Sequence, residues 1–312
     1  MIFVFPGQGS QKIGMGKDIY DNFSSARDVF HEVDDAISFS LSRLIFEGTE
    51  EELKKTENTQ PALMTVSMAF VEVMKKEFGV NLPEKAKFFA GHSLGEYTAL
   101  CAADAISLID AARILRVRGK AMAEACPTGG AMAAILGLDI NQVEQIVEEA
   151  CGDSSPGSVK VQVANDNSVG QVVISGHEEA VRKSIEIAQS RGAKRAVVLP
   201  VSGPFHSELM QPAAEILKEV LCDVEFKTPS KPIIANVTAK AETENFKELL
   251  LKQITGRVRW VESIRYAESQ GVSKCVEVGA GKVLTGLVKR ISPSMQLVNI
   301  NSVESFEQLK EM

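Results

Sequence analysis

Short apolar runs alternate with longer amphipathic stretches along most of this chain. The short runs predict buried strands at residues 2–5, 86–90, 233–236, 274–278 and 296–300. The longer stretches predict helices, and one that is apolar around most of its circumference predicts a buried helix from Gln60-Pro61 to Phe78. Strands that alternate with helices indicate an α/β fold with a parallel sheet.

The order of predicted strands and helices changes between residues 128 and 200. Strands are predicted there at 131–136, 159–164, 172–175 and 193–199, and helices at 140–150 and 178–190. The polar stretch 165–170 predicts a hairpin turn. The order strand-helix-strand-strand-helix-strand is that of a ferredoxin-like unit. We therefore predict a hydrolase-like α/β catalytic core of residues 1–127 and 201–312, with a ferredoxin-like subdomain of residues 128–200 inserted into it.

A candidate nucleophile follows the second predicted strand, in Gly91-His92-Ser93-Leu94-Gly95. A G-x-S-x-G pentapeptide between a strand and a helix is typical of a nucleophile elbow, in which a sharp turn exposes the serine at the carboxyl end of the strand. The glycines remove side chains where the two backbones crowd together. The alternative is a plain strand-to-helix turn that contains a serine by chance.

The first predicted strand also ends in a glycine-rich loop, Pro6-Gly7-Gln8-Gly9-Ser10-Gln11. Open α/β folds place their ligands at such strand ends. The loop lacks the G-K-[ST] of a phosphate-binding P-loop and the third glycine of a dinucleotide-binding motif. It is therefore either a loop that presents backbone N–H groups or an ordinary connection.

An arginine is predicted to face inward from the helix that starts at Ser107 and runs to about Ala125. On a helical wheel, Arg118 lies in the middle of the apolar stripe, which consists of Ala111, Ile114, Leu115, Ala121, Met122 and Ala125. A buried guanidinium without an anion is very costly. Its anion is either a protein carboxylate or part of a substrate.

The candidate base is one of four histidines. His31 falls in an amphipathic helix, and His177 precedes a helix start. His92 is adjacent to Ser93, so its side chain should leave the turn in another direction. His206 follows the second hinge of the subdomain and is the best candidate by elimination, although a lone histidine is usually structural.

Composition narrows the class of protein. The chain has 312 residues and a net charge of −7, which argues against a general binder of nucleic acid or of anionic membranes. No apolar run approaches the roughly 18 residues that a membrane helix needs, and the first residues do not resemble a signal peptide. The five cysteines are dispersed without a C-x-x-C pair, which fits reduced thiols in the cytoplasm and no zinc site.

Several of these pieces together resemble the malonyl-CoA:acyl-carrier-protein transacylases of fatty-acid synthesis and the related acyltransferase domains of polyketide synthases. They occur in the family's order and over nearly the full length. The matching motifs are Phe5-Pro6-Gly7-Gln8-Gly9-Ser10-Gln11, Gly91-His92-Ser93-Leu94-Gly95-Glu96-Tyr97, Arg116-Val117-Arg118-Gly119-Lys120, Asn165-Asp166-Asn167, Pro200-Val201-Ser202-Gly203-Pro204-Phe205-His206-Ser207 and Glu277-Val278-Gly279-Ala280-Gly281-Lys282-Val283-Leu284.

The resemblance implies a role for each matching residue. Ser93 would be the acylated nucleophile and His206 its general base, held by the main-chain carbonyl of Gln253 instead of a carboxylate. The backbone N–H groups of Gln8 and Leu94 would form the oxyanion hole.

Substrate selection is also implied by the resemblance. Arg118 would bind the malonyl carboxylate through two parallel hydrogen bonds. Phe205, placed as in malonyl-selective relatives, would crowd an α-methyl branch. Asn165 and Asn167 either touch the substrate or merely form their turn, and we favour the turn.

The implied reaction moves a malonyl group from malonyl-CoA to the phosphopantetheine thiol of acyl carrier protein through a malonyl-serine, without a metal or an organic cofactor. We expect a cytoplasmic monomer. Since carrier proteins of this pathway are acidic, docking needs a local basic patch, for which we consider Lys282, Lys289 and Arg290. Three alternatives stay open: a serine esterase or thioesterase with the same Ser-His pair, a non-catalytic carrier-binding module, and a transferase of another acyl group.

Overall fold

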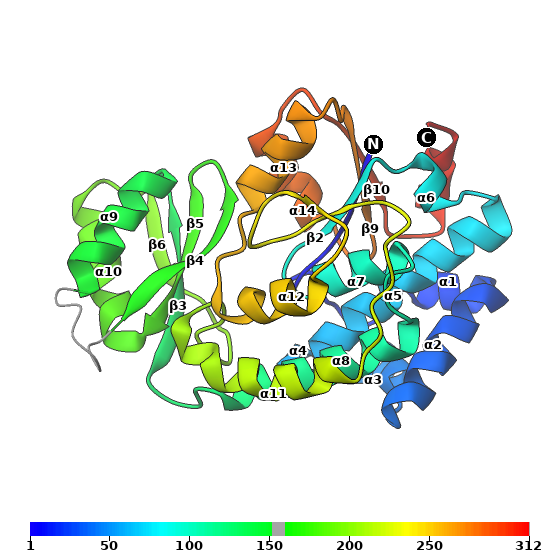
Figure 1. Cartoon of the computed structure of the whole chain (residues 1–312), viewed down its shortest axis with the longest axis horizontal. Helices are drawn as coiled ribbons and strands as arrows, with labels where there is room; N and C mark the ends of the chain where they lie inside the picture. Colours follow the sequence, from blue (N-terminus) through cyan, green and yellow to red (C-terminus); the bar gives the residue numbers. More distant parts are fainter. Residues whose placement is uncertain (152–159, 312) are drawn as a thin grey trace.

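Two sheets organise the computed structural model, which describes residues 1–151 and 160–311 (Figure 1). The larger sheet has the strand order β10-β9-β1-β2-β7-β8. Its strands are β1 (Ile2–Phe5), β2 (Phe88–Gly91), β7 (Ile233–Ile234), β8 (Ala241–Glu242), β9 (Lys274–Val278) and β10 (Gln296–Ile300). Neighbours from β10 to β7 pair in parallel, and β8 is antiparallel to β7. The prediction of a parallel sheet is confirmed.

Helices cover both faces of this sheet. They are α1 (Lys17–Asn22), α2 (Ser24–Ile37), α3 (Leu41–Glu47), α4 (Glu50–Lys54), α5 (Thr56–Phe78), α6 (Leu82–Lys85), α7 (Gly95–Ala102), α8 (Leu108–Glu124), α11 (Gln211–Cys222), α12 (Phe246–Thr255), α13 (Trp260–Ser269) and α14 (Val283–Ile291), with short 3₁₀ helices at Glu208–Met210 and Glu304–Glu311. Phe3 and Phe5 pack with residues of α5, α7 and α8, whereas Ile2 and Val4 pack with residues of α13 and α14. Burial on both faces explains why the strands are apolar throughout. Within the described ranges, no helix is both long enough and apolar enough to cross a membrane.

The start of the long buried helix differs from the prediction. Helix α5 begins at Thr56 rather than at Gln60, so that Pro61 lies inside it. Proline has no N–H, and it therefore leaves a carbonyl of the preceding turn without its helical donor. The Arg116 side chain donates to the carbonyl of Glu57 (Nη1 to O, 3.1 Å), which compensates for that loss.

The smaller sheet stands to one side of the molecule with its own two helices (Figure 1). It comprises β3 (Gly130–Leu136), β4 (Val161–Ser168), β5 (Gln171–His177) and β6 (Arg195–Val198), with α9 (Ile140–Cys151) and α10 (Glu178–Ser190). The strands are antiparallel in the order β4-β5-β3-β6. This is the ferredoxin-like topology that the order of elements predicts. The domain boundaries at residues 128 and 200 stay a prediction, which the separate apolar cluster of this unit supports.

The predicted hairpin turn between β4 and β5 is present, but its predicted bounds, residues 165–170, are wrong. Strand β4 continues to Ser168, and the turn is confined to Val169 and Gly170. Two register shifts in the pairing of β4 with β5 accommodate the polar residues. The other edge of β4 bonds to the core, since the N–H of Asp166 donates to the carbonyl of Val258 (3.0 Å). Residue 159, where this strand was predicted to begin, lies outside the described residues.

Candidate active site

Ser93 occupies a sharp turn between β2 and α7, with φ at +53°. The turn depends on its two glycines. A Cβ atom on Gly91 would lie 1.8 Å from the carbonyl oxygen of Gly95, and one on Gly95 would lie 2.3 Å from that of Phe5. The Ser93 N–H donates to Oδ1 of Asn236 (2.8 Å), which holds the strained residue in place.

Substituting Gly91 by alanine is therefore expected to lower the free energy of unfolding by about 3 kcal/mol or more, because backbone atoms cannot move aside as a flexible side chain does. Gly286→Ala is the matched control. A Cβ atom there meets nothing within 4 Å, and alanine in the α14 helix should stabilise the fold by about 0.5–1 kcal/mol. Urea unfolding measures both variants, and equal midpoints for Gly91→Ala and the parent would contradict the packing argument.

His206 lies within reach of Ser93, with 2.8 Å between Ser93 Oγ and His206 Nε2. Its other ring nitrogen, Nδ1, lies 2.8 Å from the main-chain carbonyl oxygen of Gln253. Because a carbonyl only accepts, Nδ1 carries the proton, and Nε2 is left to accept one from the serine hydroxyl. Burial, reinforced by the charge of Arg118, lowers the pKa of His206 to about 3, so the ring is neutral near pH 7.

Arg118 is buried, with 1% of its surface exposed, as its place in the apolar stripe predicts. It donates to Oε1 of Gln60 (2.6 Å) from Nη1, and to Oε1 of Gln253 (2.9 Å) and Oγ of Ser93 (3.1 Å) from Nη2. All three acceptors are neutral. Of the ion pairs between described residues, none includes Arg118. Of the two anions that the sequence allows for Arg118, the protein carboxylate is therefore not among its hydrogen-bond partners.

A cavity of about 590 Å³ joins these groups. Of the residues that the sequence proposed for catalysis and substrate binding, all but Gln253 line it: Gln8, Ser93, Leu94, Arg118, Asn165, Asn167, Phe205 and His206. Across the described parts of the chain, the backbone N–H groups of Gln8 and Leu94 have no acceptor. They are thus available to a ligand in the cavity.

Asn165 and Asn167 differ from our expectation that they form a turn. Both lie in β4 and line the cavity. Oδ1 of Asn167 lies 2.7 Å from Nε2 of His92, whose ring packs edge-on against Trp260. His92 thus contacts Asn167 and not the Ser93 hydroxyl, as expected, and forms part of the wall of the cavity.

Comparison with known proteins identifies the family of this chain. The model of the acyl transferase domain matches residues 2–296. The chain belongs to this family.

Individual relatives resemble it over almost their whole length. The malonyl CoA-acyl carrier protein transacylase of Bacillus subtilis is 48% identical over 308 residues, which are 98% of this chain and 94% of the relative. The enzyme of the same name from Escherichia coli is 42% identical over 313 residues, 99% of this chain and 98% of the relative.

Solved structures agree with the sequence relatives. The acyl-carrier-protein-S-malonyltransferase of Bartonella henselae is 50% identical, with a TM-score of 0.95 over 99% of this chain and 98% of that one. A malonyl-transacylase in complex with a type II polyketide-synthase acyl-carrier protein is 40% identical, with a TM-score of 0.93 over 99% and 98%. These likenesses confirm the predicted fold class and the predicted family.

Sequence reasoning missed two residues of this acyltransferase that lie beneath the elbow. Glu96 is fully buried and accepts a hydrogen bond from the Gln253 side chain. The side chain of Asn236 accepts a hydrogen bond from the Ser93 N–H. A signal for Glu96 was available, because it is the one acidic residue in the otherwise apolar α7 helix. For Asn236 there was none, since it is the last residue of the apolar run that predicts the strand 233–236.

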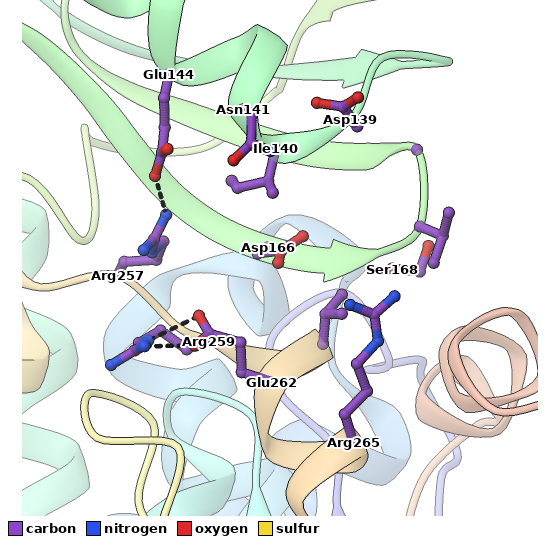
Figure 2. Close-up of a pocket in the computed structure, with 13 residues that line it drawn as sticks. Asp139, Ile140, Asn141, Glu144, Asp166, Ser168, Arg257, Arg259, Glu262 and Arg265 are labelled. Atoms are coloured by element: carbon purple, nitrogen blue, oxygen red, sulfur yellow. Dashed lines mark hydrogen bonds and ion pairs between the residues drawn. The ribbon is translucent and has the colours of Figure 1, made fainter.

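A second cavity, of about 500 Å³, lies on the other side of β4, between the small subdomain and α13 (Figure 2). Arg257 pairs there with Glu144 at 2.6 Å, and Arg259 pairs with Glu262. Burial raises the pKa of Asp166 to about 6, and the charge of Arg257 opposes that rise. Neither Ser93 nor His206 lines this cavity. The described residues contain no cluster of three or more side chains suited to hold a metal ion.

Proposed function

We propose that this acyltransferase moves a malonyl group from malonyl-CoA to the phosphopantetheine thiol of acyl carrier protein, and so supplies fatty-acid synthesis. The observation that carries the proposal is Arg118. Its buried guanidinium lies 3.1 Å from the Ser93 hydroxyl and contacts neutral oxygens, so an acyl group that carries a carboxylate would supply the anion that it lacks. The names of the relatives support the same substrates.

In the first step, Oγ of Ser93 attacks the thioester carbonyl while its proton passes to Nε2 of His206. The carbonyl of Gln253 stabilises the imidazolium by accepting from Nδ1. The tetrahedral intermediate expels the CoA thiolate, which takes the proton from Nε2. A malonyl ester on Ser93 remains.

The oxyanion of the intermediate is stabilised by the free N–H groups of Gln8 and Leu94, each worth about 3 kcal/mol in comparable sites. In the second step, the thiol of the carrier gives its proton to His206 and attacks the ester. Ser93 leaves with that proton. One thioester replaces another, so the reaction is reversible and none of these steps uses a cofactor.

Phe205 provides selectivity in this proposal. Its ring lines the cavity next to His206, where it would crowd a methyl branch on the acyl group. We also propose that Asn165 and Asn167 contact the substrate, since both line the same cavity.

Docking of the carrier is proposed at Lys282 and Lys289, which are exposed near the start and the end of α14. Arg290 is less available, because it donates to Oγ of Ser168 (3.1 Å) and Oε1 of Gln171 (2.7 Å). We propose that the protein acts as a monomer. We also propose that it acts in the cytoplasm, which the five free cysteines support.

Hydrolysis is the competing function, because an esterase uses the same Ser-His pair. Intact mass spectrometry after mixing with malonyl-CoA separates the two. We expect a malonyl adduct on the parent that disappears on addition of holo acyl carrier protein, and no adduct on Ser93→Ala. Steady release of free malonate without an adduct would favour the hydrolase, and neither adduct nor turnover would favour a binding module.

A further inference from the structure

Glu96 is a charged residue that the proposed chemistry does not use. It lies in the first turn of α7 with none of its surface exposed. Its Oε2 accepts from Nε2 of Gln253 (2.8 Å) and from the N–H of Asn236 (3.1 Å), while Oε1 has no hydrogen-bond partner among the described residues. Burying a carboxyl that has two hydrogen bonds and no ion pair costs folding free energy. Any effect of Glu96 on the site therefore acts through its two hydrogen-bond partners.

The first partner, Gln253, has a side-chain amide with one donor end and one acceptor end. Its Nε2 faces three acceptors: Oε2 of Glu96 (2.8 Å), the carbonyl oxygen of Ser93 (2.9 Å) and, at a longer distance, Oδ1 of Asn236 (3.4 Å). Its Oε1 faces Nη2 of Arg118 (2.9 Å), which only donates. A flipped amide would set donor against donor at Arg118 and acceptor against acceptor at Glu96.

We propose that Glu96 is a positioning residue, which keeps the Gln253 amide oxygen on Arg118 and thereby aims the guanidinium at the acyl group. The inference rests on the proposed function, since it concerns how Arg118 selects a malonyl group. The second partner, Asn236, supports the elbow through its side chain, whose Oδ1 accepts from the Ser93 N–H (2.8 Å) and whose Nδ2 donates to the carbonyl of Gly91 (2.7 Å). Glu96 accepts only from the main-chain N–H of Asn236, so these two bonds to the elbow do not depend on it.

The protonation state of Glu96 does not alter this role. Burial raises the pKa of Glu96 to about 7, opposed by the hydrogen bonds from Gln253 and Asn236 and by the charge of Arg118, and assisted by the charge of Glu242. A proton on the unpartnered Oε1 leaves Oε2 free to accept. A neutral glutamine with its oxygen in the place of Oε2 should therefore perform the same task.

Two substitutions of similar length test the proposal. Glu96→Gln keeps an acceptor toward Gln253, whereas Glu96→Met fills the space without one. We expect Glu96→Met to lower kcat/KM for malonyl loading by roughly 10- to 100-fold, a range typical for loss of a group that orients another. The rate of acylation by a small neutral ester, which makes no use of Arg118, should fall at least tenfold less. Glu96→Gln should stay within about threefold of the parent for both substrates.

Gln253→Met is a second, independent test of the proposal, in case Glu96→Met does not fold. It removes the amide but keeps the main-chain carbonyl that holds His206, so it should show the same selective loss of malonyl loading. The double variant should be no worse than either single one, because both act through one amide.

Several results would overturn the inference. They are an unchanged malonyl rate in Glu96→Met, an equal fall for malonyl-CoA and the neutral ester, a fall in Glu96→Gln as large as in Glu96→Met, or additive losses in the double variant. The parent is measured first. If it does not load malonyl at all, the proposed function fails and the inference falls with it, whereas a normal parent with an insensitive Glu96→Met removes the inference alone.

Discussion

Arg118→Ala is expected to lower kcat/KM for malonyl loading by about a hundredfold to a few thousandfold and to reverse the preference for malonyl over acetyl. A buried carboxylate that loses its only cationic partner costs about 3–5 kcal/mol, and each 1.4 kcal/mol is a factor of ten. An acetyl group has no carboxylate and loses nothing. It also gains from the removal of a buried guanidinium that it cannot pair.

Loading rates with malonyl-CoA and acetyl-CoA, followed by intact mass, measure this switch. Arg118→Lys separates charge from shape, because lysine keeps the charge without the two-pronged geometry, and we expect it to recover only part of the malonyl rate. Lys120→Ala is the matched control, since it removes an exposed cation from the same helix. Equal losses for both acyl groups in Arg118→Ala would contradict a carboxylate-binding role and leave Arg118 as a structural residue.

The sequence predicts most of this fold because its signals are local. Apolar runs such as Ile2–Phe5 are fully buried and become strands of the parallel sheet. The inward position of Arg118 followed from a single helical wheel, which needs no knowledge of the rest of the chain. The elbow was equally visible, since its two glycines lie four positions apart and the steric reason for both is contained in one turn.

Contacts between distant segments were not predictable in this way. The helix α5 runs through Pro61 because Arg116 of another helix binds the carbonyl that the proline leaves free. Asn165 and Asn167 read as a turn because their residue types favour one, yet tertiary bonds from β4 to the core override that preference. The support of the elbow by Asn236 joins residues 143 positions apart, and no periodicity reports such a pair.

His206→Ala is expected to lower the rate of malonyl loading on Ser93 by about a thousandfold or more, because no other described residue offers a base within hydrogen-bond distance of the serine hydroxyl. Typical general-base contributions are 10²- to 10⁴-fold. Single-turnover loading followed by intact mass measures the loss, and unfolding in urea confirms that the variant is folded. Loading within tenfold of the parent would show that another group takes the proton.

The pH dependence of the parent provides a sharper test of the same residue. The base must be neutral to accept a proton, so the rate falls only when acid protonates the imidazole. Burial together with the charge of Arg118 lowers the pKa of His206 to about 3, and the neutral form therefore persists as the pH falls. We expect kcat/KM to be retained at pH 5, where an ordinary histidine with a pKa near 6.5 would be almost fully protonated.

Glu96→Gln is measured in parallel as a control, because burial raises the pKa of Glu96, which lies next to the site, to about 7. An inflection that survives this substitution does not belong to Glu96, and one near pH 3 fits His206. Since a bound malonyl carboxylate offsets the charge of Arg118, the acid limb of kcat should lie at higher pH than that of kcat/KM, which reports the free enzyme. In Arg118→Ala the acid limbs of kcat and of kcat/KM should lie at the same pH, because the charge that separates them is gone. A single limb near pH 6.5 in every variant would mean that His206 is solvated, and burial would then not be what keeps the base neutral.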